Sequence, residues 1–217
     1  MALALFDLDN TLLAGDSDYA WGEFLIERGL VDGEMYRRMN NQYYAQYQAG
    51  TLDIHEFLGF ALEPLARIDR TALDTLHAEF LQSKIRPIIA PGTRALLDKH
   101  RARGDLLVII TATNRFVTGP IARALGVEHL IATEPEELAG CYTGRVAGTP
   151  CYREGKVELL NHWRQRHGVT LADSWGYSDS HNDLPLLEQV AHPVAVDPDP
   201  RLRAEAIARG WPIITLR

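Results

Sequence analysis

Two aspartates, Asp7 and Asp9, follow the first apolar segment of the chain and could act together in one polar site. The apolar residues 2–6 are too few for a helix and are typical of a buried strand. Because alternate side chains of a strand point the same way, both aspartates can face one pocket. Two adjacent carboxylates repel each other, so this pocket needs a cation, a shared proton or both. The structural alternative is an Asx-type turn, in which Asp9 and Asn10 bond nearby backbone groups.

Polar residues also follow two later strands that the sequence predicts. A strand over 105–110 precedes Thr111, and another strand precedes Asp179 and Asp183. Ligands of parallel sheets bind beyond the carboxyl ends of the strands, so we expect these residues to gather near the first two aspartates. Four carboxylates without convergent Cys or His point to Mg²⁺, which prefers oxygen ligands and usually keeps several waters.

A lysine and a hydroxyl would complete this site. Lys156 stands at the start of a helix predicted over 156–167, and Thr111 offers the hydroxyl. Carboxylate, metal, hydroxyl and ammonium together are the parts of phosphoryl transfer through an aspartyl-phosphate. Each residue also has an ordinary structural alternative: Thr111 as a strand residue, Lys156 as a solvated helix residue, His181 as a surface loop residue, and Asp183 as the N-cap of a helix beginning at Leu184.

The elements that must position these residues predict an α/β core interrupted by a helical insertion. Four helices without an intervening strand are expected between residues 16 and 86. From residue 87 onward strands and helices alternate, which predicts a doubly wound, mostly parallel sheet. We therefore assign residues 1–15 and 87–217 to the core domain and residues 16–86 to a small helical cap domain.

Composition restricts the classes of function. The chain has 217 residues, of which 46% are hydrophobic, enough to bury a core. Its net charge of −7 argues against a nucleic-acid partner, because binding to phosphate backbones depends on Lys and Arg. Cys141 and Cys151 are too few for a disulfide framework, and no apolar run is long enough to span a membrane. We expect a cytoplasmic monomer or homodimer without a nucleic-acid or membrane partner.

Four segments carry a resemblance to a known family: Asp7-Leu8-Asp9-Asn10-Thr11, Thr111, Lys156 and Asp179-Ser180-His181-Asn182-Asp183. In this order they resemble the four motifs of the haloacid dehalogenase (HAD) superfamily. The helical insertion and the segment Gly140-Cys141-Tyr142-Thr143-Gly144 resemble the cap and the glycine-rich hairpin of its phosphoserine-phosphatase-like branch, subfamily IB. The resemblance covers nearly the whole chain. It implies a HAD-like Rossmannoid fold and a Mg²⁺-dependent phosphatase for a small-molecule phosphate monoester.

The resemblance also implies catalytic and metal-binding roles. Asp7 would be the nucleophile, and Asp9 would be the general acid and base whose backbone carbonyl also binds Mg²⁺. An aspartate at this second position is what the phosphatases of the family have. Asp179 would bind Mg²⁺ directly, with Asp183 supporting it from outside the ligand shell. Lys156 would offset the charge of Asp7 and the phosphate.

Further positions concern the substrate. Thr111, Ala112 and Asn182 would bind the phosphate. Asp16 lies where this branch keeps a carboxylate for the substrate ammonium, although it could simply cap the first helix. Ala61 replaces the arginine that grips the substrate carboxylate in phosphoserine phosphatases, so an amine-bearing ester such as histidinol phosphate fits better than phosphoserine. Three nearby arginines could still supply the missing charge: Arg37, Arg38 and Arg67.

Two other functions use similar residues. A mutase would pass the phosphoryl group to a second hydroxyl instead of water. A phospho-accepting signalling module would also need an acidic cluster, a threonine at a strand end and a lysine. The helical insertion and the Asp-x-Asp spacing argue against the signalling module.

Overall fold

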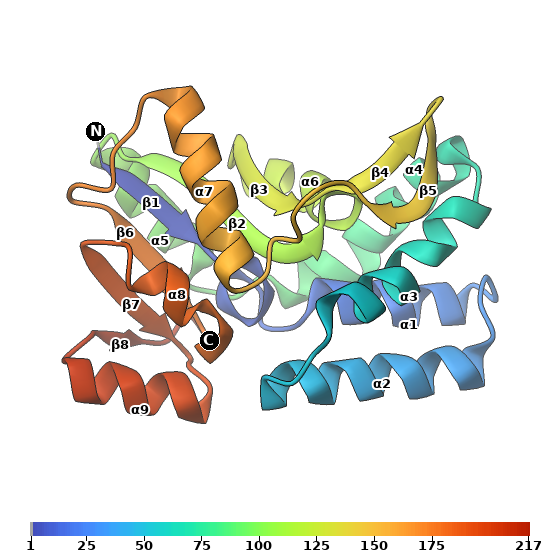
Figure 1. Cartoon of the computed structure of the whole chain (residues 1–217), viewed down its shortest axis with the longest axis horizontal. Coiled ribbons are helices and arrows are strands. Elements are labelled where there is room, and N and C mark those ends of the chain that lie inside the picture. The colour runs from blue at the N-terminus through green and yellow to red at the C-terminus, as the bar shows by residue number, and fades with distance from the viewer. Residues whose placement is uncertain (1) are drawn as a thin grey trace.

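The computed structural model describes residues 2–217 and contains one six-stranded, entirely parallel sheet (Figure 1). The strand order is β3-β2-β1-β6-β7-β8. Strand order reverses at β1, so β1 and β6 lie side by side although most of the chain separates them. The bounds are Leu3–Phe6 (β1), Leu106–Asn114 (β2), His129–Thr133 (β3), Trp175–Ser178 (β6), His192–Val196 (β7) and Ile213–Ile214 (β8).

Helices cover both faces of this sheet, which confirms the doubly wound fold. Alternate residues of β1 enter different cores, because side chains of a strand point to opposite faces. Leu3 and Leu5 pack with residues of α7 (Glu154–His167) and α8 (Leu184–Leu187). Ala4 and Phe6 pack with residues of α5 (Thr93–Ala102) and α6 (Arg115–Ala124). Helix α9 (Pro200–Arg209) packs against β7.

Four helices follow β1 in the chain before α5 and lie on the right of Figure 1. They are α1 (Ser17–Glu27), α2 (Gly33–Ala49), α3 (Ile54–Arg67) and α4 (Arg70–Phe80). Each begins after an aspartate whose carboxylate accepts backbone N–H groups of the first turn: Asp16, Asp32, Asp53 and Asp69. Such N-caps supply acceptors to N–H groups that have no partner within the helix, which fixes where each helix starts. We refer to α1–α4 as the cap.

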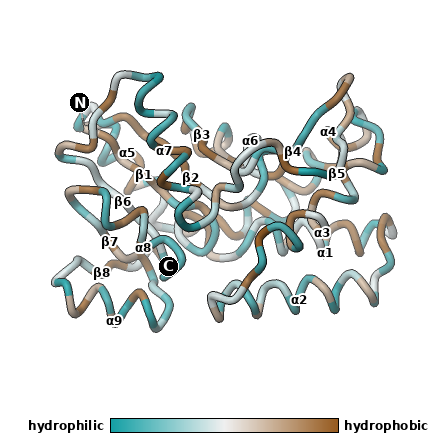
Figure 2. Tube along the Cα trace, viewed as in Figure 1, coloured by the Kyte–Doolittle hydropathy of each residue, from teal (hydrophilic) through white to brown (hydrophobic). Residues whose placement is uncertain are grey.

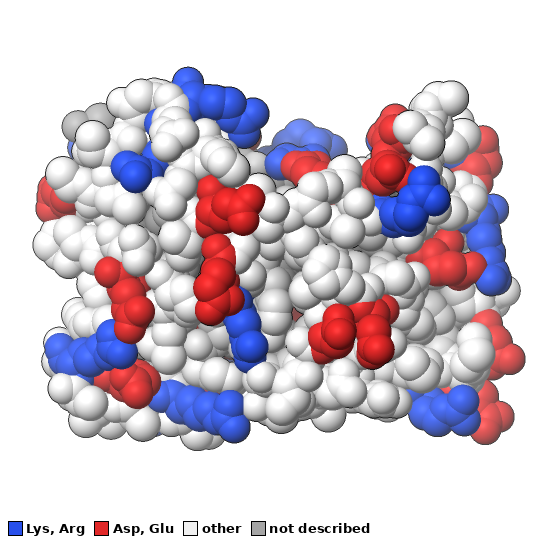
Figure 3. Space-filling view, viewed as in Figure 1, with Lys and Arg blue, Asp and Glu red and all other residues white. Residues whose placement is uncertain are grey.

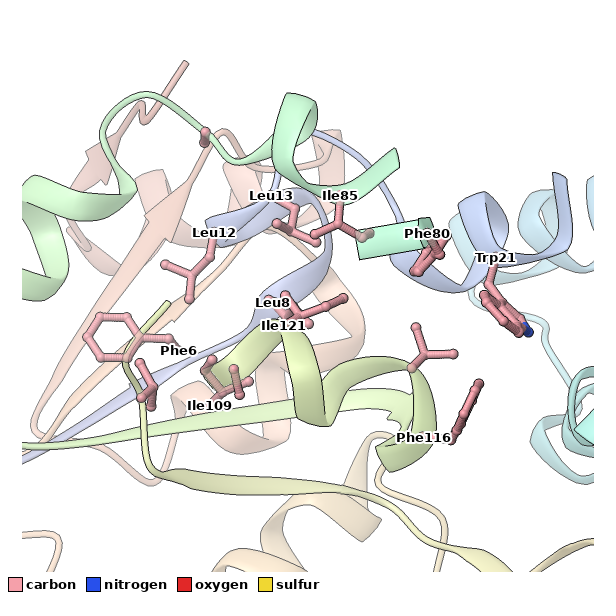
Figure 4. Close-up of a cluster of buried hydrophobic side chains, with 14 of the residues drawn as sticks. Phe6, Leu8, Leu12, Leu13, Trp21, Phe80, Ile85, Ile109, Phe116 and Ile121 are labelled. Carbon is pink, nitrogen blue, oxygen red and sulfur yellow. The ribbon is translucent and has the colours of Figure 1, made fainter. Parts of the chain in front are cut away.

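A continuous hydrophobic core joins the sheet to the cap, as Figure 4 shows. The loop after β1 contributes Leu8, Leu12 and Leu13, all fully buried. These leucines lie between the sheet residue Phe6 and the cap residue Phe80 (Figure 4). The loop that carries the first motif is therefore anchored on both sides by apolar packing.

The expected glycine-rich hairpin is confirmed, and it packs against helix α3 of the cap. Its antiparallel strands are β4 (Pro135–Leu138) and β5 (Cys141–Val146). At Gly144 the backbone has φ of +79°, and an added Cβ would lie 3.4 Å from the Ala66 side chain of α3. Glycine thus permits both the left-handed backbone and the close approach of β5 to α3.

Some element boundaries differ from the prediction. The strand predicted to end at residue 110 continues to Asn114, so Thr111 lies within β2 and not after it. A register shift against β3 between Thr111 and Asn114 allows this extension, and apolar periodicity does not report it. The last helix before β7 begins at Leu184, as predicted, and has only four residues, Leu184–Leu187.

The surface carries charges of both signs. Figure 3 shows acidic and basic side chains interspersed on this face, without an extended basic patch. In Figure 2, α2 is largely hydrophilic, whereas α9 mixes hydrophilic and hydrophobic residues. Within residues 2–217, no helix combines the length and the apolar character that crossing a membrane requires.

Candidate active site

The candidate site lies at the carboxyl ends of β1 and β6, where the strand order reverses. This switch point is where open α/β sheets bind their ligands. The Asp7 N–H still bonds the Tyr177 carbonyl of β6 at 2.9 Å, so the first aspartate stands at the last pairing position between the two strands. Asp179 follows β6 directly, and the two motifs meet at one edge as expected.

Lys156 stands at the centre of the buried charges. Its side chain is 2% exposed, and its Nζ donates to Asp7 Oδ1 at 2.7 Å and to Asp183 Oδ2 at 2.8 Å. Burial alone would lower the Lys156 pKa, but the charges of Asp183 and Asp7 outweigh it and hold the pKa above its usual range. Lys156 is therefore a permanent cation, and the alternative of a solvated helix lysine is wrong.

A threonine hydroxyl joins the two aspartates that follow the neighbouring strands. Thr11 Oγ1 lies 3.2 Å from Asp7 Oδ2 and 3.1 Å from Asp179 Oδ1, and it accepts the Asp179 N–H at 3.0 Å. Burial is the main cause that raises the Asp7 pKa to about 7, against the opposing effect of Lys156. Burial and then the charge of Asp7 raise the pKa of Asp179 well above its usual range.

Asp9 turns away from this pair, which corrects the expected cluster of four carboxylates. Its Oδ1 accepts the Ser17 N–H at 2.6 Å, and its Oδ2 accepts the hydroxyls of Thr113 at 2.8 Å and Thr111 at 3.3 Å. The turn follows from the backbone, because Asp9 is extended and the next residue, Asn10, is left-handed with φ of +57°. Asparagine tolerates that region better than most residues.

The Asp183 carboxylate also lies outside the expected cluster of four carboxylates, but for a different reason. It stands at the N-cap position of α8, but its carboxylate makes no capping bond and instead binds Lys156 and the Ser178 hydroxyl, the latter at 2.7 Å. The alternative of a plain N-cap is therefore wrong. Across residues 2–217, no three Asp, Glu, His or Cys side chains converge as ligands of one ion.

The remaining side-chain arrangement still fits Mg²⁺. This ion usually binds through one or two carboxylates and completes its shell with water and phosphate, so it does not need three protein carboxylates. Asp7 supplies a buried carboxylate and Asp179 a partly buried one, and the Thr11 hydroxyl lies between them. Burial is the main cause that raises the pKa of both carboxyl groups, and a divalent cation would favour their charged forms.

Asn182 differs from the expectation that it binds phosphate. Its Nδ2 donates to the Tyr47 carbonyl of α2 at 3.1 Å, and its Oδ1 accepts from the Tyr152 hydroxyl and from Arg153 Nε, each at 3.1 Å. Both ends of the amide are already bonded between core and cap. In this structure Asn182 therefore positions the cap, and the phosphate role would need these bonds to break.

Two arginines reinforce the same contact between core and cap. Arg153 Nη2 donates to the Gly50 carbonyl at 2.5 Å, and Arg201 Nη1 donates to the Ala49 carbonyl at 2.8 Å. Both acceptors lie at the C-terminal end of α2, where unpaired carbonyls concentrate negative partial charge. Three core side chains thus hold the end of α2 through backbone atoms alone.

A cavity between core and cap opens onto Asp7 and Asp9 and holds about 590 Å³ of empty space, part of it open to solvent. The predicted residues Asp7, Asp9, Asp16, Thr111 and Ala112 all line it. The described lining also includes six aromatic residues and contains no Lys, Arg or His: Tyr19, Tyr43, Tyr44, Tyr47, Phe57 and Tyr152.

The cap residues considered for substrate binding have different positions. Asp16 caps α1, with Oδ1 accepting the N–H groups of Asp18 and Tyr19 at 2.9 and 2.8 Å. Ala61 is buried outside the cavity lining. The three arginines that could have supplied a positive charge also lie outside the lining and are exposed: Arg37, Arg38 and Arg67.

Sequence reasoning missed several residues of the site. Thr113 and Ser178 hold Asp9 and Asp183, while Asp18 faces the cavity two residues after Asp16. Thr11 was part of the first motif, but no role was given to its hydroxyl. A hydroxyl residue within two positions of a motif residue is the one local pattern that could have found Thr113 and Ser178.

Comparison with known proteins agrees with this geometry. Residues 4–188 match the model of the haloacid dehalogenase-like hydrolase family. A histidinol-phosphatase of Neisseria meningitidis serogroup C (strain 8013) is 45% identical over 220 residues, which cover 99% of each chain. A solved structure from Bordetella pertussis Tohama I, of a protein with unknown function, is 48% identical, covers 100% of this chain and 99% of its own, and has a TM-score of 0.94.

A more distant structure supports the fold alone. It is described as a phospho-aspartyl intermediate analogue of phosphoserine phosphatase, and it is 18% identical with a TM-score of 0.73. It covers 100% of this chain and 93% of its own. The matched family and the phosphatase relatives exclude a non-enzymatic signalling module. The chain belongs to the haloacid dehalogenase-like hydrolases, and among them it is a phosphatase.

Proposed function

We propose that this phosphatase uses Mg²⁺ to hydrolyse an amine-bearing small-molecule phosphate monoester, with histidinol phosphate as the first candidate. The observation that carries the substrate class is the cavity beside Asp7, whose described lining is acidic and aromatic and lacks Lys, Arg and His. A leaving alcohol that carries a cation suits such a lining. A substrate carboxylate, as in phosphoserine, would meet no cation among these residues.

The residues at the strand ends can carry both halves of the reaction. A carboxylate oxygen of Asp7 attacks phosphorus and forms an aspartyl-phosphate, while the leaving oxygen takes a proton from Asp9. Water then gives a proton to Asp9, attacks phosphorus and releases phosphate, which restores the Asp7 carboxylate. The bonds from Ser17, Thr111 and Thr113 hold the Asp9 carboxyl in place for both transfers.

The positive charges have separate tasks. Lys156 offsets the charge of Asp7 and of the incoming phosphate from behind, and Asp183 keeps the Lys156 ammonium in that position. Mg²⁺ would be held by the carboxylates of Asp7 and Asp179 and by the backbone carbonyl of Asp9. When bound, it supplies electrostatic stabilisation of the negative oxygens of the transferring group.

Steady-state kinetics with two esters test this proposal. With Mg²⁺ present, we expect kcat/KM for histidinol phosphate to exceed that for phosphoserine by roughly 100-fold, because an unpaired substrate carboxylate would be desolvated in the cavity. EDTA should abolish both activities, and added Mg²⁺ should restore them. Faster turnover of phosphoserine would overturn the substrate assignment, and full activity after EDTA would overturn the metal assignment.

A further inference from the structure

Two carboxylates at the start of α1, Asp16 and Asp18, line the cavity but differ in their partners. Asp16 Oδ1 already accepts two backbone N–H groups, at 2.9 and 2.8 Å, as the cap of α1. Asp18 has one side-chain contact, in which Asn114 Nδ2 lies 3.4 Å from its Oδ1. At that distance a hydrogen bond is weak. Within the described chain, neither oxygen of Asp18 is paired with Lys, Arg or His.

Aromatic rings line the same cavity as these carboxylates. Tyr43 of α2 packs against Phe57 of α3 with ring centroids 5.5 Å apart, and Tyr44 of α2 lies 5.5 Å from Tyr19 of α1. The faces of such rings attract cations, and the effect grows when water is excluded. The cap therefore presents carboxylates and rings to the cavity, and the lining itself provides no cation to balance them.

We propose that Asp18, and not the expected Asp16, is the specificity-determining residue that receives the cationic group of the leaving alcohol. This inference rests on the proposed function, because it assigns a residue to the substrate class named there. The Asp16 carboxylate is held in place by the two N–H groups that its Oδ1 caps. The Asp18 carboxylate has one long contact and can turn toward a substrate N–H⁺ donor. Burial and the charge of Asp9 raise the Asp18 pKa to about 7, and a bound cation would oppose both effects.

The experiment compares Asp18→Asn with two matched variants, Asp16→Asn and Asp53→Asn. All three replace a carboxylate of the cap with an amide of the same shape, and Asp53 caps α3 outside the cavity lining. Each variant is assayed with histidinol phosphate and with p-nitrophenyl phosphate, whose alcohol carries no cation. Calorimetry measures the affinity for histidinol, the free amino alcohol, independently of turnover.

We expect Asp18→Asn to lower kcat/KM for histidinol phosphate by roughly 10- to 100-fold, the usual size of a charge-assisted hydrogen bond. Activity toward p-nitrophenyl phosphate should change by less than about 3-fold, and histidinol should bind more weakly by a factor similar to the loss for its ester. Asp16→Asn and Asp53→Asn should not change the ratio between the two esters. Asp18→Ser, measured in the same way, replaces the amide variant if thermal melting shows that variant to be unfolded.

Three outcomes would overturn the inference. An equal loss toward both esters would make Asp18 structural, and a selective loss in Asp16→Asn would return the role to Asp16. Unchanged histidinol affinity in Asp18→Asn would also contradict it. If the wild-type protein hydrolyses neither ester, the proposed function fails, while the calorimetric comparison still decides whether Asp18 holds the cation.

Discussion

The core and the cap line the same cavity, but the carboxylates of the core have close bonding partners and Asp18 of the cap does not. On the core side, Lys156 is bonded to the carboxylates of Asp7 and Asp183, and Ser178 donates to the same Asp183 oxygen. Thr113 donates to a third carboxylate, that of Asp9. On the cap side, Asp18 faces rings and has one long contact. Side chains with fixed partners hold reacting atoms in position, whereas a side chain without a partner is available to a substrate. We infer that the core determines the chemistry and the cap selects the alcohol.

The largest expected effect comes from the core side. Asp7→Asn removes the nucleophile, so kcat should fall by at least about 10⁴-fold for every ester tested. The loss of kcat should be equal for esters of cationic and neutral alcohols, because the core acts on the phosphate and does not bind the alcohol. Phosphate release from histidinol phosphate and p-nitrophenyl phosphate measures it, with Asp32→Asn as a control outside the cavity. A loss confined to one ester would break the division between core and cap.

Lys156→Met should lower the free energy of unfolding of the core and also inactivate the enzyme. Removing one member of a buried ion network leaves the carboxylates of Asp7 and Asp183 uncompensated, which costs about 3–5 kcal/mol. Urea denaturation measures this free energy. Lys84→Met is the control, because Lys84 forms an exposed ion pair with Glu27 and should cost less than about 1 kcal/mol. Equal losses in the two variants would mean that the buried network is not what stabilises the core.

Thr113→Val tests how the core holds the general acid. Valine has a similar shape but removes the 2.8 Å bond to Asp9 Oδ2, so kcat should fall by roughly 10-fold with little change in KM, a part of the usual general acid–base contribution. Thr143→Val, which removes a hydroxyl from the hairpin, is the matched control. A rise in KM at constant kcat would instead place Thr113 in substrate binding.

The smallest expected effect concerns the cap side. Asp16→Ala should lower the free energy of unfolding by about 1 kcal/mol, the usual contribution of a helix N-cap. Asp69→Ala, which removes the cap of α4 away from the cavity, should cost a similar amount in the same denaturation experiment. If Asp16→Ala costs no stability but lowers activity toward histidinol phosphate by 100-fold or more, Asp16 binds substrate and is not merely a helix cap.

The sequence was sufficient to predict the elements and the strand-end residues of the site. Apolar periodicity identified the alternating core, and the position of Asp7, Thr111 and Asp179 along parallel strands implied one shared edge. Lys156 lies beside Asp7, because a helix start near that edge brings its ammonium inward. These predictions succeeded because regular elements convert spacing along the chain into direction in space.

The remaining features depend on contacts between distant segments. Asn182 bonds the Tyr47 carbonyl of α2, and no local pattern shows which backbone atom of the cap will arrive there. The turn of Asp9 toward Thr113 depends on a left-handed Asn10 followed by packed leucines. The difference between Asp16 and Asp18 appears only once the backbone of α1 has taken one of the two carboxylates as its cap.

The three bonds that hold α2 to the core all end on main-chain oxygens. Every amino acid brings the same oxygen, so residues 47, 49 and 50 could change identity while the docking angle of the helix persisted, provided that the chain still turned left-handed at Gly50. These three bonds would therefore remain if tyrosines on the inner side of α2 were exchanged for other residues. With this attachment, mutations in α2 alone could change which ester is preferred while the catalytic residues of the core stay the same.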